Sequence, residues 1–160
     1  MHRATLILAA IAIVSTNALT ADAKNKGTLP KGSTPLSAEE AHKFYAGKTI
    51  DFKEYKYYFA DDGTLYGVDS KKTIFSEGVW KVNGNEVCMD TTWRGKNRSD
   101  KPYLYIRCTK LYNSKGKIWN VMTKPNDQYV GNTDMEEAKK LRKGDRVSAT
   151  VAKLKTAYGY

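Results

Sequence analysis

Apolar and polar residues alternate with a period of two, the pattern of a half-buried β-strand, over much of the chain after residue 48. Segment 49–53 alternates apolar with charged residues, and three aromatic side chains share one face of segment 55–59. The sequence Asp-Asp-Gly at 61–63 then signals a turn, where aspartates commonly bond nearby backbone N–H groups. Because segment 65–68 resumes the alternation, these residues predict an antiparallel hairpin rather than a carboxylate pair for acid–base chemistry.

A second hairpin is predicted around Asn83-Gly84, a dipeptide that is typical of two-residue β-turns. With the turn centred on this pair, Trp80 lies opposite Val87 and Lys81 lies opposite Glu86. The apolar face of this hairpin is then formed by Trp80, Val82, Val87 and Met89. We therefore expect this face to lie in the core.

Further alternating runs predict strands at 103–111, 117–122 and 128–130, and a last strand at 147–151. Two short helices are also predicted. The first spans 38–46, after Ser37 and Glu40 in the spacing of a capping box, and the second spans 134–142, with acidic residues early and basic residues late.

These elements predict a mostly β fold. Consecutive hairpins imply antiparallel pairing, and a long antiparallel meander tends to curl and protect its edges. We expect a small antiparallel barrel or strongly curved, lipocalin-like sheet, with a short N-terminal helix and a short helix before the last strand.

The N-terminus resembles a secretory signal peptide. A short basic start precedes an apolar run at 4–14 that is interrupted only by Thr5, and Ala-Asp-Ala at 21–23 fits a signal-peptidase site. The run would cover only about half of a bilayer's hydrocarbon core as a helix, so it does not predict an anchor. The predicted organisation is a signal peptide over 1–23 cleaved after Ala23, a flexible leader over 24–35, and one β-rich domain over 36–160. This predicts a periplasmic or secreted protein without a transmembrane segment.

The two cysteines, Cys88 and Cys108, each lie in a predicted strand. In an oxidising compartment such a pair usually forms a disulfide. Neither residue has C-x-x-C spacing or a nearby histidine, so the sequence favours a structural disulfide over a redox or metal site. We predict no cofactor and no metal.

The formal net charge of the 160-residue chain is +10 at pH 7. Such a charge favours contact with anions, and export makes acidic polysaccharides or other envelope polyanions commoner targets than nucleic acid. The segment between the predicted strands that carry Cys88 and Cys108 mixes aromatic and basic residues without strand periodicity. Its candidate anion or glycan contacts are Trp93, Arg94, Lys96, Arg98, Lys101 and Tyr103. The alternative interpretation is a solvated loop.

The sequence offers little support for an enzyme. The only histidine after residue 23 is His42, on the first predicted helix, and no G-x-S-x-G sequence accompanies it. Zinc ligands in a recognisable spacing are also missing. A glycosidase pair of carboxylates, which needs no sequence proximity, stays open as an alternative.

Several segments resemble a family of small exported alphaproteobacterial proteins that is classed as a domain of unknown function. The resemblance rests on 59–67, on 78–82 with Val87-Cys88, and on 105–108. It implies a lipocalin-like sheet, export and a disulfide, and it carries no active site.

The sequence thus predicts a non-catalytic envelope protein that binds an anionic glycan or supports cell-envelope or exopolysaccharide production. A protein-binding adaptor or inhibitor of a cell-wall enzyme, and a carrier of a small apolar ligand inside the barrel, are the alternatives. The oligomeric state is not predicted.

Overall fold

The computed structural model of the protein describes residues 27–96, 102–124, 133–134 and 136–160. The elements in chain order are β1 (Thr34–Pro35), α1 (Ala38–Tyr45), β2 (Lys48–Asp51), β3 (Tyr55–Phe59), β4 (Thr64–Asp69), β5 (Ile74–Asn83), β6 (Glu86–Gly95), β7 (Tyr103–Ser114), β8 (Lys117–Lys124), β9 (Thr133–Asp134), α2 (Glu136–Lys140), β10 (Leu141–Lys143) and α3 (Ser148–Tyr158).

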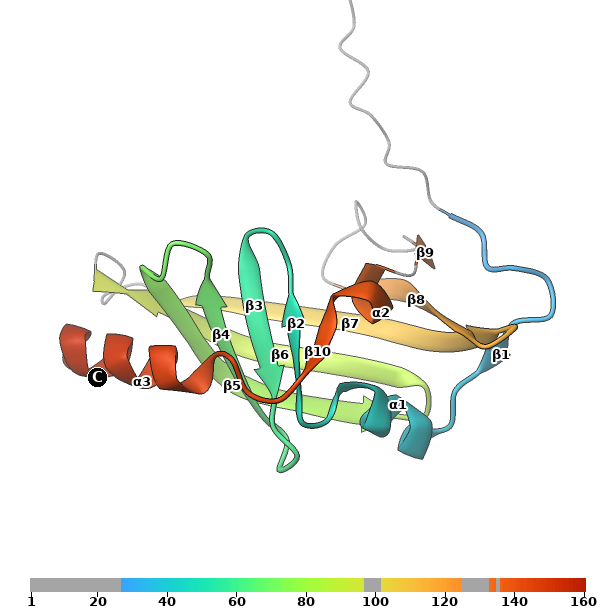
Figure 1. Cartoon of the computed structure of the whole chain (residues 1–160), viewed down its shortest axis with the longest axis horizontal. Helices are drawn as coiled ribbons and strands as arrows, with labels where there is room; N and C mark the ends of the chain where they lie inside the picture. The colour runs from blue at the N-terminus through green and yellow to red at the C-terminus, as the bar shows by residue number, and fades with distance from the viewer. Residues whose placement is uncertain (1–26, 97–101, 125–132, 135) are drawn as a thin grey trace, which may run out of the picture.

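The strands form one antiparallel sheet in the order β10-β2-β3-β4-β5-β6-β7-β8-β9, which curls into a half-barrel (Figure 1). The predicted mostly β, strongly curved sheet is confirmed, as are the helix near its N-terminal side and the short helix before the last strand. Strands β2 to β9 pair in chain order as a simple meander. The strand β10 returns to pair with β2, and β1 pairs with β7 at Thr34 and Pro35, inside the segment expected to be a leader.

The backbones of β5 and β6 approach each other closely at Gly78. A Cβ added at Gly78 would lie 1.9 Å from the carbonyl oxygen of Asp90, so no larger residue fits this position. Strands β5 and β6 can therefore pair along their whole length while the sheet bends.

The hairpin between β5 and β6 has the predicted apolar face but a different register. Trp80 pairs with Met89 and Val82 with Val87, so the prediction of Trp80 opposite Val87 is wrong. The turn is centred on Gly84 and Asn85, and Gly84 has a φ of +58°. Asn85 is tied to β7, because its side chain donates to the carbonyl of Leu111, 3.0 Å away. This contact with a neighbouring strand favours a turn at Gly84-Asn85 over the predicted turn at Asn83-Gly84.

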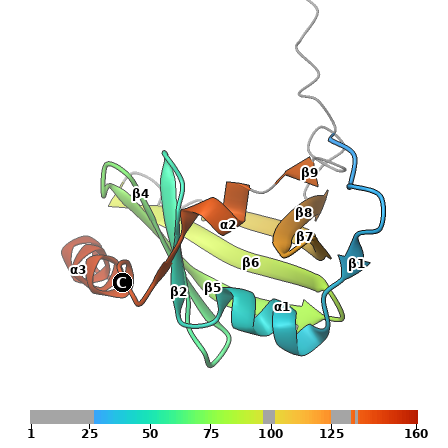
Figure 2. The same cartoon turned by 45° about the vertical axis from the view of Figure 1, so that its right-hand side comes forward.

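Two apolar clusters cover opposite faces of the sheet. The larger lies on the concave face beneath α1 and includes Tyr45, Phe59, Leu65 and Trp80. The smaller lies on the convex face, where Val68 and Phe75 pack against α3. Figure 2 shows α3 on one side of the sheet and α1 and α2 on the other.

The predicted strand at 147–151 is wrong, because these residues open the helix α3. Val147 and Val151 are both 1% exposed, whereas Ala149 is exposed. The Asp145 carboxylate accepts hydrogen bonds from the backbone N–H groups of Val147 and Ser148, at 2.8 and 3.0 Å, and so holds the chain where the helix begins. The predicted helix over 134–142 is shorter than expected, since residues 141–143 form β10.

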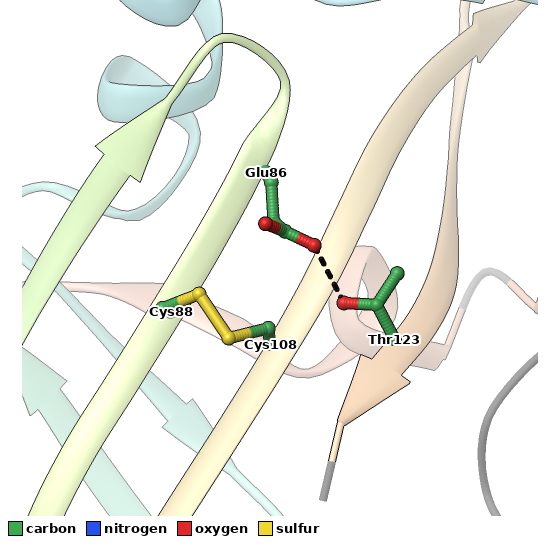
Figure 3. Close-up of a disulfide and its surroundings, with 4 residues drawn as sticks. All are labelled: Glu86, Cys88, Cys108 and Thr123. Atoms are coloured by element: carbon green, nitrogen blue, oxygen red, sulfur yellow. Dashed lines mark hydrogen bonds between the residues drawn. A yellow bond between two sulfur atoms is a disulfide. The ribbon is translucent and has the colours of Figure 1, made fainter. Parts of the chain in front are cut away.

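Cys88 and Cys108 form the predicted disulfide between directly paired positions of β6 and β7 (Figure 3). On the same face, Thr123 of β8 donates a hydrogen bond of 2.7 Å to Glu86 of β6 and so bridges across β7. The predicted signal peptide over 1–23 and the predicted strand at 128–130 lie outside the described residues.

Candidate functional site on the concave face

Alternate residues of β7 line the concave face and become steadily more buried along the strand. Tyr103 is 55% exposed, Tyr105 and Arg107 are half-buried, Thr109 is 4% exposed and Leu111 is fully buried. The concave face is thus open near Tyr103 and closed near Leu111. We call this surface the trough.

Aromatic rings gather at the open end of the trough. The ring of Tyr103 stacks on Tyr105 at a centroid distance of 6.4 Å. Trp93 lies edge-on to Tyr55 at 5.3 Å and to Tyr57 at 5.7 Å. Tyr55 is 38% exposed, so it and Tyr103 both present ring surface to solvent.

Small residues make this aromatic arrangement possible. Tyr57, Gly67, Ser76 and Trp93 pair in one row across four strands. A Cβ at Gly67 would lie 2.2 Å from the Ser76 hydroxyl and 3.0 Å from the ring of Tyr57. The missing side chain in the middle of the row therefore leaves room for Tyr57 and Trp93 to meet over it.

A buried ionic cluster lies deeper in the trough. Glu137 of α2 is 2% exposed, and its carboxylate accepts hydrogen bonds from the Tyr45 hydroxyl at Oε2 and from Arg107 Nη2 at Oε1. A cavity of about 10 Å³, room for the centre of one water molecule, adjoins the cluster. It is lined by Tyr45, Ile50, Phe59, Val87, Met89, Arg107, Thr109 and Glu137.

Burial controls the electrostatics of this cluster. It raises the pKa of Glu137 to about 8, and the positive charge of Lys140 opposes the rise. Burial also raises the pKa of Tyr57 far above its usual value, with the neighbouring Tyr105 adding to the shift. The trough therefore holds a carboxyl group that gains or loses its proton near neutral pH.

Two cations flank the same aromatic ring between β2 and β3. The Arg107 guanidinium lies 5.5 Å from the ring centroid of Phe52, and the Lys140 ammonium group lies 5.1 Å from it. This places positive charge between the aromatic open end and the buried carboxylate. Aromatic rings and positive charges are thus close together in this part of the trough.

The residues predicted as glycan contacts are only partly brought together. Trp93 and Arg94 belong to β6 rather than to a loop. Trp93 is 4% exposed and packs in the core, while Arg94 lies 5.7 Å from the ring of Tyr160. Lys96 is exposed, and Tyr103 begins β7. Arg98 and Lys101 lie outside the described residues. Tyr103 is thus the predicted contact that the trough presents to solvent.

The buried cluster escaped sequence analysis. Tyr45 and Glu137 are 92 positions apart, and Arg107 and Glu137 are 30 apart, so no local spacing connects them. The sequence did contain one indication of this cluster. Arg107 alternates with residues of β7 that face away from the core, so its charged side chain was due to point into the concave face.

Other chemical candidates are weak. Within the described ranges, no three His, Cys, Asp or Glu side chains are grouped as a metal site would require. His42 is exposed and stacks on Trp80 at 4.9 Å, which fits a packing role. Among the described helices, none has the length and apolarity needed to cross a membrane.

One comparison with known proteins identifies a family for the chain. Residues 8–147 match the model of a family described as a protein of unknown function (DUF995). No curated protein matches the chain, and no solved structure matches it.

Proposed function

Since the chain belongs to this family of proteins of unknown function (DUF995), we propose a function from the geometry of the trough. The protein is a non-catalytic periplasmic or secreted protein that binds an anionic glycan at the open end of the trough. In this role it supports production or maintenance of the cell envelope or of exopolysaccharide.

The observation that carries the proposal is the exposed aromatic surface beside cations. Tyr55 and Tyr103 present rings that suit stacking against sugar faces, and Arg107 and Lys140 lie further along the same trough. Guanidinium groups pair with carboxylate or phosphate through paired hydrogen bonds. A sugar polymer with acidic substituents would meet both kinds of contact.

Two features support an extracytoplasmic location. The sequence of residues 1–23 has the pattern of a cleavable signal peptide. The Cys88–Cys108 disulfide is of the kind that persists in oxidising compartments.

The test compares two neighbouring residues on opposite faces of β7. Tyr103 is 55% exposed on the concave face, and Leu104 is 59% exposed on the convex face. Tyr103→Ala should weaken retention on an immobilised acidic polysaccharide, because it removes the exposed ring against which a sugar face would stack. Leu104→Ala is the matched control and should retain the wild-type affinity.

Salt dependence completes the test. Retention should fall as sodium chloride rises, since exposed charges are screened over about 10 Å at 0.1 M. Equal retention of both variants and the wild type, or retention that does not respond to salt, contradicts the proposal.

A second candidate function uses the convex face. Val79 is 45% exposed and shares a row with Ile106, which is 39% exposed and lies two residues from Leu104. Such exposed apolar residues favour a protein-binding module. Leu104→Asp should then abolish capture of a partner from envelope extracts and leave glycan retention intact. The carrier alternative gains no support, because the cavity holds about 10 Å³.

A further inference from the structure

We propose that Arg107, Tyr45 and Thr109 form a carboxylate-binding site inside the half-barrel, and that Glu137 occupies this site when no ligand is bound. A carboxylate on the ligand, such as that of a uronic acid, takes the place of Glu137. This inference names the group that the deep part of the trough recognises, and to that extent it rests on the proposed function.

The first argument is the way Glu137 is held. One carboxylate oxygen accepts from Arg107 on β7 and the other from Tyr45 on α1. A cation and a phenol that meet both oxygens from separate elements recognise a carboxylate as a group. The apolar side chains around them exclude water and so strengthen each contact.

The second argument is independent of Glu137. The Thr109 hydroxyl is buried, lines the same cavity and has no hydrogen-bond partner among the described residues. A buried hydroxyl without a partner is costly, and natural proteins keep few of them. Glu137 therefore leaves the Thr109 hydroxyl without a hydrogen bond. A ligand with a hydroxyl group beside its carboxylate would supply one.

The third argument is the shallow attachment of α2. Among its residues 137–140, Glu137 is buried, Ala138 and Lys139 are exposed, and Lys140 is half-buried. The helix thus enters the trough mainly through one ionisable side chain rather than through an apolar face. Breaking that contact exposes little apolar surface, so exchange of Glu137 for another carboxylate is energetically accessible.

The site is continuous with the open end of the trough. Arg107 lies two residues from Tyr105 on the same face of β7, a separation of about 7 Å along a strand. Its side chain is 12% exposed. A glycan stacked on Tyr103 and Tyr105 would reach Arg107 with its next acidic substituent.

A small-molecule rescue experiment tests the site directly. Glu137→Ala removes the internal carboxylate and leaves Arg107 and Tyr45 facing a vacancy. Acetate and propionate should then raise the melting temperature of the variant in a saturable way. Propionamide, and chloride at matched ionic strength, should have no such effect, and the wild type should respond less. An equal response to propionate and propionamide would overturn the proposal.

A binding experiment tests the displacement. If Glu137 occupies the site in nine of ten molecules, Glu137→Ala should bind a uronic-acid oligosaccharide about tenfold more tightly than the wild type. Glu137→Gln keeps the shape of the side chain but cannot ionise. Above pH 8, where the wild-type carboxyl group is ionised, it should shift affinity in the same direction, and it replaces the alanine variant if that variant does not fold. Unchanged or weaker binding by a folded variant overturns the displacement and leaves the proposed glycan function standing. Rescue by acetate without glycan binding by either protein overturns the proposed function and leaves the carboxylate site standing.

Discussion

The hydroxyl of Tyr45 on α1 donates a hydrogen bond to the carboxylate of Glu137 on α2, although the two residues are 92 positions apart. This contact joins both helices of the concave side inside the half-barrel. Arg107 of β7 donates to the other oxygen of the same carboxyl group, so the sheet and the two helices share one buried ionisable group.

Replacing Tyr45 by Phe should lower the free energy of unfolding by about 1–3 kcal/mol, because the buried carboxyl group of Glu137 loses one hydrogen-bond donor. The ring should stay in place, since it packs against Phe44 and Phe59 at centroid distances of 4.9 and 4.6 Å. Urea unfolding at neutral pH measures the loss. In a double-mutant cycle with Glu137→Gln, additive losses would show that the two groups are not coupled.

The pKa of Glu137 predicts a pH dependence of stability. Its pKa is about 8 in the folded protein, against an ordinary value of 4.5. Between these values the folded state keeps a proton that the unfolded state releases, so stability falls as pH rises, by up to about 1.4 kcal/mol per unit from this group. Arg107 on β7 and Lys140 on α2 favour the ionised form and limit the effect.

Glu137→Gln lacks this titration. Its stability relative to the wild type should therefore increase from pH 5 to pH 8, as measured by urea unfolding at each pH. A constant difference across that window would mean that Glu137 is ionised throughout.

The Cys88–Cys108 disulfide closes a loop over a separation of 20 residues. In the chain-entropy account such a crosslink contributes about 3 kcal/mol, chiefly by restricting the unfolded chain. The double variant Cys88→Ala, Cys108→Ala should unfold at lower urea yet keep the wild-type far-UV circular dichroism, because β6 and β7 pair along eight positions. Loss of the β-sheet spectrum in native buffer would show that the crosslink is needed for the fold itself.

The turn residues and the alternation of apolar and polar residues predicted the order of the meander strands. They did not predict the residue pairing of β5 with β6 correctly. The predicted and observed pairings of Trp80 differ by two positions, from Val87 to Met89. A two-residue slip leaves every side chain on its own face, so the hydrophobic pattern does not distinguish the two registers. The choice depends on the tertiary contact of Asn85 with Leu111.

The candidate site was predicted only at its edge. Tyr103 and the basic residues near it stand out because aromatic and basic residues gather in one segment. Tyr45, Arg107 and Glu137 come from three distant segments, and their meeting depends on the curl of the sheet and on the return of the chain through α2. Cysteine pairing was predictable because only two cysteines exist in the chain.

The apolar residues of the C-terminal segment fit the spacing of a strand and also that of a helix, and this ambiguity leads to a last prediction. Val147, Ala149 and Val151 alternate like a strand, but Val147, Val151 and Leu154 also follow helical spacing and pack on the convex face. In the helix, Val151 is buried and Ala149 is exposed. Val151→Ala should therefore cost about 2 kcal/mol in the free energy of unfolding, since it removes two buried carbon atoms and leaves a cavity.

Ala149→Asp is the matched control. It should cost less than about 0.5 kcal/mol, because an exposed acidic residue in the first turn of α3 interacts favourably with the helix dipole. In a strand the same substitution would bury a charge between two valines and cost several kcal/mol. Chemical unfolding of the two variants beside the wild type separates these cases: a large loss for Ala149→Asp with little loss for Val151→Ala would contradict the helix and its packing on Phe75.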